Sequence, residues 1–115
     1  MAPSNAQLAR QVLGALSRGD VPGFGTLIHP RIEVHTARGV YRGAEDAQEW
    51  ARKRFEHLDR HFAVDRLEES GDEVTAEVRT QYVWRDSGLV GDEEPVKIHM
   101  RFAGGKLGRW EYRET

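Results

Sequence analysis

The sequence contains no cysteine, which excludes a disulfide framework, a thiol nucleophile and a cysteine-ligated zinc site. It also lacks an excess of one charge: 17 Lys and Arg against 19 Asp and Glu give a net charge of −2, which offers nucleic acid or an anionic membrane no attraction. No apolar run approaches the about 20 residues of a membrane-spanning helix. The N-terminal stretch MAPSNAQLARQ does not have a basic segment followed by an apolar one, so no signal peptide is expected, and a cytoplasmic location is the default expectation.

Chain length and composition predict one globular domain over residues 1–115. Hydrophobic residues make up 38% of the 115 residues and charged residues 31%, a balance that supports both a core and a polar surface. A domain of this size buries roughly two-thirds of its unfolded surface. The sequence has no linker, repeat or low-complexity segment, so a single fold is expected to form any functional site.

Two helices are predicted before residue 30. Ser4 and Gln7 resemble a capping box at the start of the first helix, and Gly19 fits its end. Its apolar residues recur at helical spacing and are Leu8, Val12, Ala15 and Leu16. Asp20 is expected to cap a short second helix, which ends before Pro30 because a residue that precedes proline disfavours helical dihedrals. The apolar residues of this second helix are Phe24, Leu27 and Ile28.

A strand and a long helix are predicted next. Residues 31–36 alternate, with Ile32 and Val34 on one side of the strand. The opposite side has Arg31, Glu33 and His35. Residues 43–58 form the strongest helical pattern of the chain. The apolar stripe of this helix comprises Ala47, Trp50, Ala51, Phe55 and Leu58.

The second half of the chain predicts antiparallel strands. Tight turns are predicted at Gly71-Asp72 and Gly104-Gly105. Strands are expected over residues 61–69, 74–84, 96–102 and 107–113. One face of the longest strand has Val74, Ala76, Val78, Thr80, Tyr82 and Trp84. Helices segregated from an antiparallel sheet indicate an α+β fold. Long twisted strands with one apolar face are expected to curve around the helices and leave a concave space.

Five stretches between Leu8 and Arg113 together have a distinctive order and spacing. They are ALSRGDVPGFGTLIHPRIEVHT, GVYRGAEDAQEW, LEESGDEVTAEVR, DSG and GGKLGRWEYRE. In these stretches the chain resembles the nuclear transport factor 2-like superfamily, and within it the SnoaL-like group of polyketide cyclases and ketosteroid isomerases. The resemblance implies a cone-shaped barrel in which three N-terminal helices pack on a curved antiparallel or mixed β-sheet and enclose a pocket. It also implies a homodimer through the outer face of the sheet.

The catalytic positions of ketosteroid isomerase are changed in this chain. That enzyme uses an aspartate base, together with a tyrosine and a protonated aspartic acid that stabilise the enolate oxygen. By position, the resemblance puts His35 in place of the base, Val12 in place of the tyrosine and Ile98 in place of the second aspartate. Both oxyanion donors are therefore missing, and steroid isomerisation by that mechanism is not expected.

His35 is the sharpest catalytic candidate, as a general base at the end of the first strand. Histidine titrates near neutral pH and exchanges protons without a large pKa shift. The alternative is a histidine that faces solvent or makes a local hydrogen bond in the strand–turn transition. Glu33 has the same parity as His35 and can orient it, or can instead form an ion pair with Arg31 or Arg42.

Several large side chains are candidates for lining a ligand pocket, since such pockets are mainly apolar with a few polar groups. The candidate ligand-binding residues are Val12, Phe24, Trp50, Tyr82, Trp84, Ile98, Met100, Trp110 and Tyr112. The alternative is that these side chains simply form the core, as expected for Phe55. If they are buried, the hydroxyls of Tyr82 and Tyr112 and the indole N–H of Trp110 need hydrogen-bond partners.

No metal and no cofactor are expected. The stretch HLDRH has two histidines at metal-binding spacing, but the helix is expected to end near Leu58. AGGKLG lacks the spacing of a phosphate-binding loop. An epoxide-hydrolase-like site would need carboxylates beside an arginine inside the cone, where the pattern has mostly hydrophobes. A dehydratase-like site would need an inward aspartate beside a histidine, and the parity of Asp65 and Asp86 leaves this open.

Two hypotheses follow. The first is a small-molecule isomerase, cyclase or dehydratase-type enzyme that acts on a compact hydrophobic substrate, with His35 as general base and Tyr82 or Trp110 as polar contacts. The second is a non-catalytic module that binds a small ligand or a protein partner. The expected partners are a small hydrophobic molecule and a second copy of the chain. The dimer surface is expected to contain Arg79, Gln81, His99 and Arg101 beside Val83.

Overall fold

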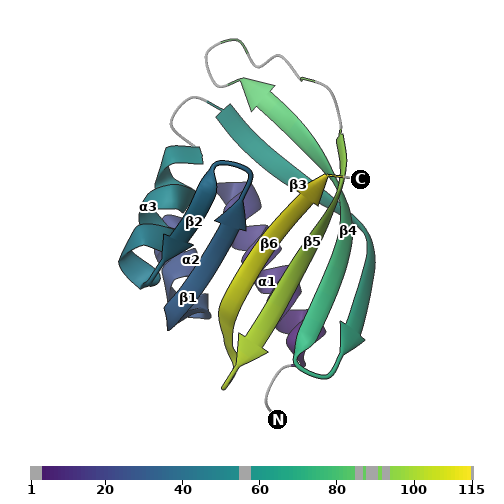
Figure 1. Ribbon diagram of the computed structural model, residues 1–115. Coiled ribbons are helices and arrows are strands. Elements are labelled where there is room, and N and C mark those ends of the chain that lie inside the picture. Colours follow the sequence, from purple (N-terminus) through teal and green to yellow (C-terminus); the bar gives the residue numbers. More distant parts are fainter. Residues whose placement is uncertain (1–3, 55–57, 85–86, 88–90, 92–93, 115) are drawn as a thin grey trace.

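The computed structural model describes residues 4–54, 58–84, 87, 91 and 94–114 as three helices and one six-stranded sheet (Figure 1). The elements are α1 (Asn5–Arg18), α2 (Val21–Leu27), β1 (Ile28–Thr36), β2 (Gly39–Arg42), α3 (Ala44–Arg54), β3 (Leu58–Ser70), β4 (Glu73–Trp84), β5 (Glu94–Ala103) and β6 (Lys106–Glu114). The predicted α+β class with three N-terminal helices is confirmed. No helix in the described part of the chain is long and apolar enough to cross a membrane.

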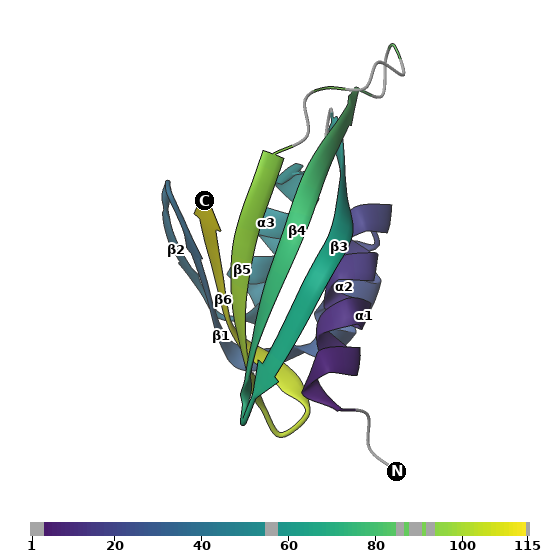
Figure 2. The same ribbon diagram turned by 90° about the vertical axis from the view of Figure 1, so that its right-hand side faces the viewer.

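The sheet is mixed and curves around the helices. Its strand order is β2-β1-β6-β5-β4-β3, with β1 and β6 parallel and every other pair antiparallel. In Figure 1, α1 runs behind the central strands, and the turned view in Figure 2 shows the strands bending away from a flat plane. The sheet therefore has an inner face, covered by the helices, and an outer face.

The first helix begins and ends as the sequence predicts, and the second helix begins as predicted. Ser4 Oγ accepts a hydrogen bond from the Gln7 backbone N–H, and Gln7 Oε1 accepts one from the Ser4 backbone N–H, at 3.2 and 2.8 Å. Gly19 ends α1 with a left-handed φ of 68°, which glycine adopts without steric cost. Asp20 caps α2 by accepting from the Gly23 N–H at 3.0 Å. Local hydrogen-bond chemistry therefore sets these ends.

Two predicted boundaries were wrong. Ile28 was assigned to the second helix but begins β1, because it pairs with Leu107 of β6, a partner far away in the sequence. Leu58 was assigned to the long helix but begins β3, where it pairs with Trp84. The helix α3 is described only as far as Arg54, and the core prediction for Phe55 lies outside the described residues.

A bulge at Gly108 determines which side chains of β6 face inward. Arg101 pairs with Arg109, and the next residue of β5, Phe102, pairs with Leu107, so Gly108 is an extra residue in β6. Leu107 and Trp110 lie three positions apart, yet both are fully buried. Strict alternation would put one of them on each face. The bulge therefore brings Trp110 to the inner face and Arg109 to the outer face.

Candidate functional site

Aromatic side chains from five elements meet on the inner face of the sheet. Trp50 of α3 is central: its ring centroid lies 6.2 Å from that of Phe24, 6.5 Å from that of Tyr41 and 5.8 Å from that of Trp110. The ring of Phe62, in β3, lies 6.3 Å from Trp110. All four pairs are tilted, within the range of favourable aromatic contacts. We call these five residues the inner aromatic cluster.

Two buried polar atoms on this face have no hydrogen-bond partner in the described structure. They are the indole Nε1 of Trp110 and the hydroxyl Oγ1 of Thr80, and both residues are 0% exposed. A buried polar group left without a partner costs about 1–3 kcal/mol. Such groups in native proteins call for an explanation, for example a bound molecule. They are therefore the best candidates for ligand contacts inside the cone.

The structure gathers most of the predicted ligand residues in one interior. Six are buried, namely Val12, Phe24, Trp50, Ile98, Met100 and Trp110. Tyr82 and Tyr112 are partly buried. Trp84, at the end of β4, remains 51% exposed and stays outside this buried set.

Three residues at the interior were missed as site residues at the sequence level: Tyr41, Phe62 and Thr80. The alternation along residues 74–84 did assign Thr80 to the apolar face. A hydroxyl within this apolar series was the feature of the sequence that could have marked Thr80 as a site residue. Tyr41 and Phe62 reach the cluster through the curvature of the sheet, which no local pattern reports. The interior site therefore depends on residues that only the fold brings together.

His35 lies on the outer face of β1 and pairs with Glu33. Its Nε2 lies 2.9 Å from Glu33 Oε1, and the two side chains are 25% and 44% exposed. Ile32 and Val34, which alternate with them, are fully buried on the inner face. The histidine–carboxylate pair is thus separated from the inner aromatic cluster by the sheet itself.

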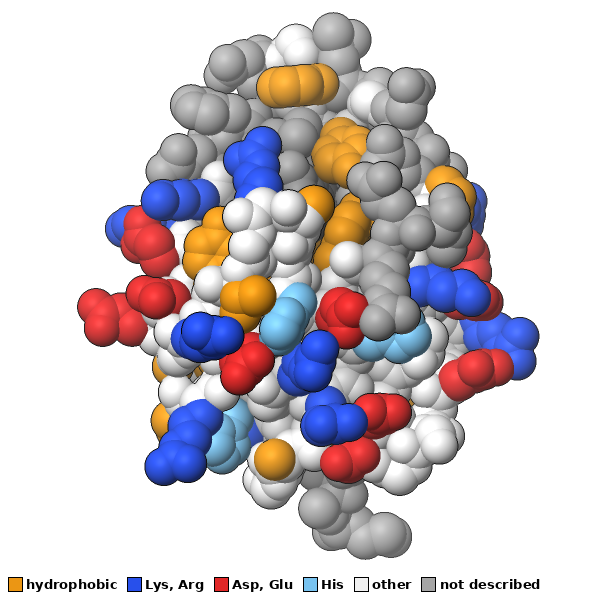
Figure 3. Space-filling view, in the orientation of Figure 1, with side chains coloured by type: hydrophobic (Ala, Val, Ile, Leu, Met, Phe, Trp, Pro, Cys, Tyr) orange, Lys and Arg blue, Asp and Glu red, His pale blue; other side chains and the backbone are white. Residues whose placement is uncertain are grey.

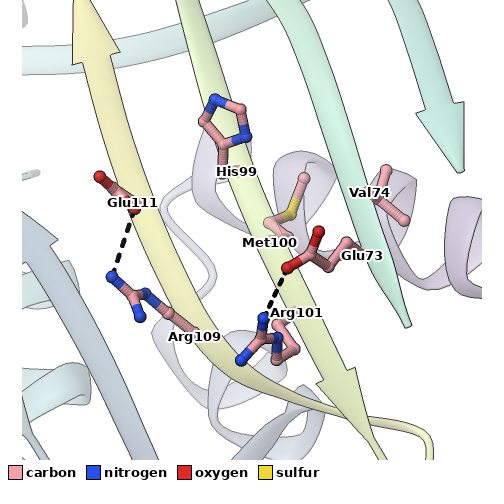
Figure 4. A pocket seen from close by; sticks show the side chains of 7 residues that line it. All are labelled: Glu73, Val74, His99, Met100, Arg101, Arg109 and Glu111. Atoms are coloured by element: carbon pink, nitrogen blue, oxygen red, sulfur yellow. Dashed lines mark hydrogen bonds and ion pairs between the residues drawn. The ribbon is translucent and has the colours of Figure 1, made fainter. Parts of the chain in front are cut away.

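The outer face also has a polar hollow of about 230 Å³. Figure 4 shows its lining residues, which are Glu73, Val74, His99, Met100, Arg101, Arg109 and Glu111. Arg101 donates a hydrogen bond from Nη2 to Glu73 Oε1 at 2.6 Å, and this bond raises the pKa of the Arg101 guanidinium. Arg109 Nη2 lies 3.4 Å from Glu111 Oε2. The two arginines are direct cross-strand neighbours. Each has its own carboxylate partner, Glu73 for Arg101 and Glu111 for Arg109.

The outer face as a whole mixes charges of both signs. Figure 3 shows basic, acidic and histidine side chains interspersed over the face that Figure 1 presents to the viewer. By strand register, Glu111 lies between His35 of β1 and His99 of β5. We call the face of β1, β6, β5 and β4 that bears these residues the outer charged face.

Within the described residues, no group of three or more His, Asp or Glu side chains could hold a metal ion. In the stretch HLDRH, His61 belongs to strand β3 rather than to a helix, and His57 lies outside the described residues. The helical metal spacing considered for this stretch therefore does not form at His61.

Comparison with known proteins gives a family and a fold. The model of the SnoaL-like domain family matches residues 9–110. No functionally curated protein matches the sequence.

Solved structures share the fold at low sequence identity. An LEH-like epoxide hydrolase from M. tuberculosis is 13% identical with a TM-score of 0.84, covering 96% of this chain and 82% of that one. An uncharacterized cystatin fold protein from Novosphingobium aromaticivorans is 19% identical with a TM-score of 0.83, covering 96% and 97%. A hypothetical protein with a ketosteroid isomerase-like fold from Catenulispora acidiphila, in complex with trimethylamine, is 16% identical with a TM-score of 0.83, covering 100% and 88%. At these identities the likeness shows the fold alone.

Proposed function

Because the chain belongs to the SnoaL-like domain family, we propose that it binds a small, mainly apolar molecule between its helices and the inner face of its sheet. The observation that supports this proposal most directly is the indole N–H of Trp110, which is fully buried among aromatic rings without a partner. Ligand sites typically combine an apolar, aromatic lining with a few fixed polar groups. The inner aromatic cluster supplies the apolar lining, and the unpaired Nε1 of Trp110 and Oγ1 of Thr80 supply the polar groups.

A titration with small aromatic probes tests this function. Acetophenone and α-methylstyrene are added to ¹⁵N-labelled protein, and the indole signals of its three tryptophans are followed by NMR. Saturable shifts centred on Trp50 and Trp110 are expected, because these rings are part of the inner aromatic cluster. If neither probe shifts the two signals, or if saturable shifts are confined to the exposed Trp84, interior binding is wrong.

A second candidate function is acid–base catalysis by His35, favoured by its 2.9 Å contact with Glu33. Glu33 would orient the imidazole, which would act as general base in an isomerase, cyclase or dehydratase-type reaction. The substrate would then approach from the outer charged face, where Glu111, the register neighbour of His35, lines the hollow. This candidate therefore needs a different binding place from the interior.

Hydrogen exchange of a carbonyl compound tests the second candidate. The methyl hydrogens of acetophenone exchange with D₂O through an enolate, and a general base accelerates the exchange. The wild type is expected to exceed buffer alone, and His35→Ala is expected to lose about 10²- to 10⁴-fold of that acceleration, with Glu33→Gln intermediate. Equal rates for the wild type and His35→Ala would remove this candidate.

The outer charged face also supports self-association. It offers both charge signs, so a copy related by a two-fold axis can place opposite charges next to one another. The residues expected at this contact lie there: Arg79 and Arg101 are exposed, and Gln81, Val83 and His99 are partly buried. The proposed partner at this face is a second copy of the chain.

A further inference from the structure

We infer that the interior ligand is uncharged and presents a hydrogen-bond acceptor to the indole N–H of Trp110, with the hydroxyl of Thr80 as a second anchor. This inference rests on the proposed function and specifies the ligand class. The two anchor atoms are the buried, unpaired Nε1 and Oγ1 described above.

The requirement for an acceptor follows from the chemistry of the indole. A tryptophan side chain has one polar atom, and that atom is a donor only. The Trp110 ring contacts the rings of Trp50 and Phe62, whose centroids lie 5.8 and 6.3 Å away. Neither of these rings has a lone pair that could accept a hydrogen bond from the indole N–H. An acceptor on a bound molecule would satisfy the N–H.

Phe62 connects the two anchors in space. Across β3 and β4 it is the direct register partner of Thr80, and residues that face each other in this way have neighbouring side chains. Its ring also contacts Trp110. Phe62 is only partly buried, whereas both anchors are fully buried. We therefore expect a ligand to reach both unpaired atoms by displacing the Phe62 side chain.

The charge of the ligand follows from the composition of the interior. Among the described residues, Thr80 is the only polar residue in the fully buried class, and the others in that class are hydrophobic. An ion placed there would lose its hydration without gaining a counter-charge, which is strongly unfavourable. A carbonyl, ether or similar neutral acceptor meets the N–H without that loss.

Three probes of nearly equal size separate these properties. Acetophenone has a carbonyl acceptor, α-methylstyrene has a CH₂ group in place of that oxygen, and benzoate has a negative charge. Acetophenone is expected to bind about 2- to 12-fold more tightly than α-methylstyrene, the ratio that one net hydrogen bond gives. Benzoate is expected to bind more weakly than either. The Trp110 indole proton should move downfield with acetophenone only.

Variants of the two anchors test the assignment. Trp110→Phe keeps an aromatic ring but removes the N–H, so the acetophenone preference is expected to fall to the part that the Thr80 hydroxyl alone supplies. Thr80→Val keeps the shape and removes the hydroxyl. It is expected to reduce the preference while the Tm of the free protein stays equal or rises, because the lost hydroxyl had no partner. Thr75→Val, the same substitution on the outer face of the same strand, is the matched control and is expected to keep the wild-type preference.

The outcomes that overturn the inference differ from those that overturn the proposed function. If acetophenone and α-methylstyrene bind the interior equally, or if benzoate binds as tightly as acetophenone, the ligand class is wrong and interior binding stands. If Trp110→Phe and Thr80→Val both keep the full preference, the anchors are wrong. If no probe binds the interior, both proposals fail together.

Discussion

The two side chains with the most distinctive chemistry, His35 and Trp110, lie on opposite faces of one sheet. His35 already has a partner, the Glu33 carboxylate at 2.9 Å, and both side chains are reached by solvent. Trp110 is fully buried, and its N–H has no partner. By the energetics of hydrogen bonding, the buried unpaired donor gains more from a ligand than the partly exposed, already paired imidazole. Residue-level evidence therefore favours the interior as the binding site.

A single carboxylate on α3 gives a pH prediction at the residue scale. Arg52 donates a hydrogen bond to Glu49, which lowers the pKa of the Glu49 carboxyl below its ordinary value of 4.5. Because the folded pKa is the lower one, the stabilising contact is complete above pH 4.5 and is lost as the pH falls through the folded pKa. A ¹³C NMR titration of the Glu49 carboxyl is expected to show this midpoint, and Arg52→Gln is expected to raise it. The same midpoint in both proteins would contradict the assigned cause.

At the scale of elements, the capping box of α1 offers a direct test. Ser4→Ala removes the side-chain acceptor of the Gln7 N–H, and the loss of an N-cap typically costs about 1 kcal/mol. Urea denaturation is expected to show a decrease of this size in the free energy of unfolding. Ser4→Asp is the control, because aspartate is an equally good cap. If Ser4→Ala is as stable as Ser4→Asp, the box does not stabilise the helix.

The bulge in β6 is the second element-scale feature with a sharp consequence. Deleting Gly108 would restore strict alternation and leave Leu107 and Trp110 two positions apart, so both would still face inward and Arg109 would still face outward. Because no side chain of β6 changes face, the deletion variant is expected to keep a cooperative unfolding transition, and the change is confined to the local twist of the strand.

Gly108→Ala is the matched control for that deletion. A Cβ at this position would lie 3.7 Å from the Arg101 carbonyl oxygen, an ordinary contact, so the substitution is expected to change the free energy of unfolding by less than about 1 kcal/mol. A deletion variant without a cooperative unfolding transition would show that the bulge itself is required for the pairing of β6.

At the scale of the whole molecule, the prediction concerns assembly through the outer charged face. The wild type is expected to sediment as a dimer at micromolar concentration, and Arg101→Glu as a monomer, because the variant puts a third carboxylate beside Glu73 and Asp72. Arg10→Glu makes the same charge change on an exposed position of α1 and is expected to remain dimeric. A wild-type monomer under these conditions would contradict the proposed interface.

The sequence by itself determined the features that depend on near neighbours. The capping box at Ser4 and the left-handed end at Gly19 follow from hydrogen bonds and dihedrals within one helical turn. The alternation of residues 31–36 correctly assigned Val34 to the core face and His35 to the other face, because successive side chains of a strand point to opposite sides. The α+β class follows from the order of these local patterns.

Only the tertiary structure decided the features that depend on distant partners. Ile28 became a strand residue because Leu107, at the other end of the chain, pairs with it. The bulge at Gly108 determined which side chains of β6 face inward, because the pairing with β5 fixes the register of β6. Whether Trp110 and Thr80 would find hydrogen-bond partners depended on which residues surround them after folding, and no local pattern contains that information. The fold was therefore predictable from short-range physics, whereas the candidate ligand site emerged from long-range packing.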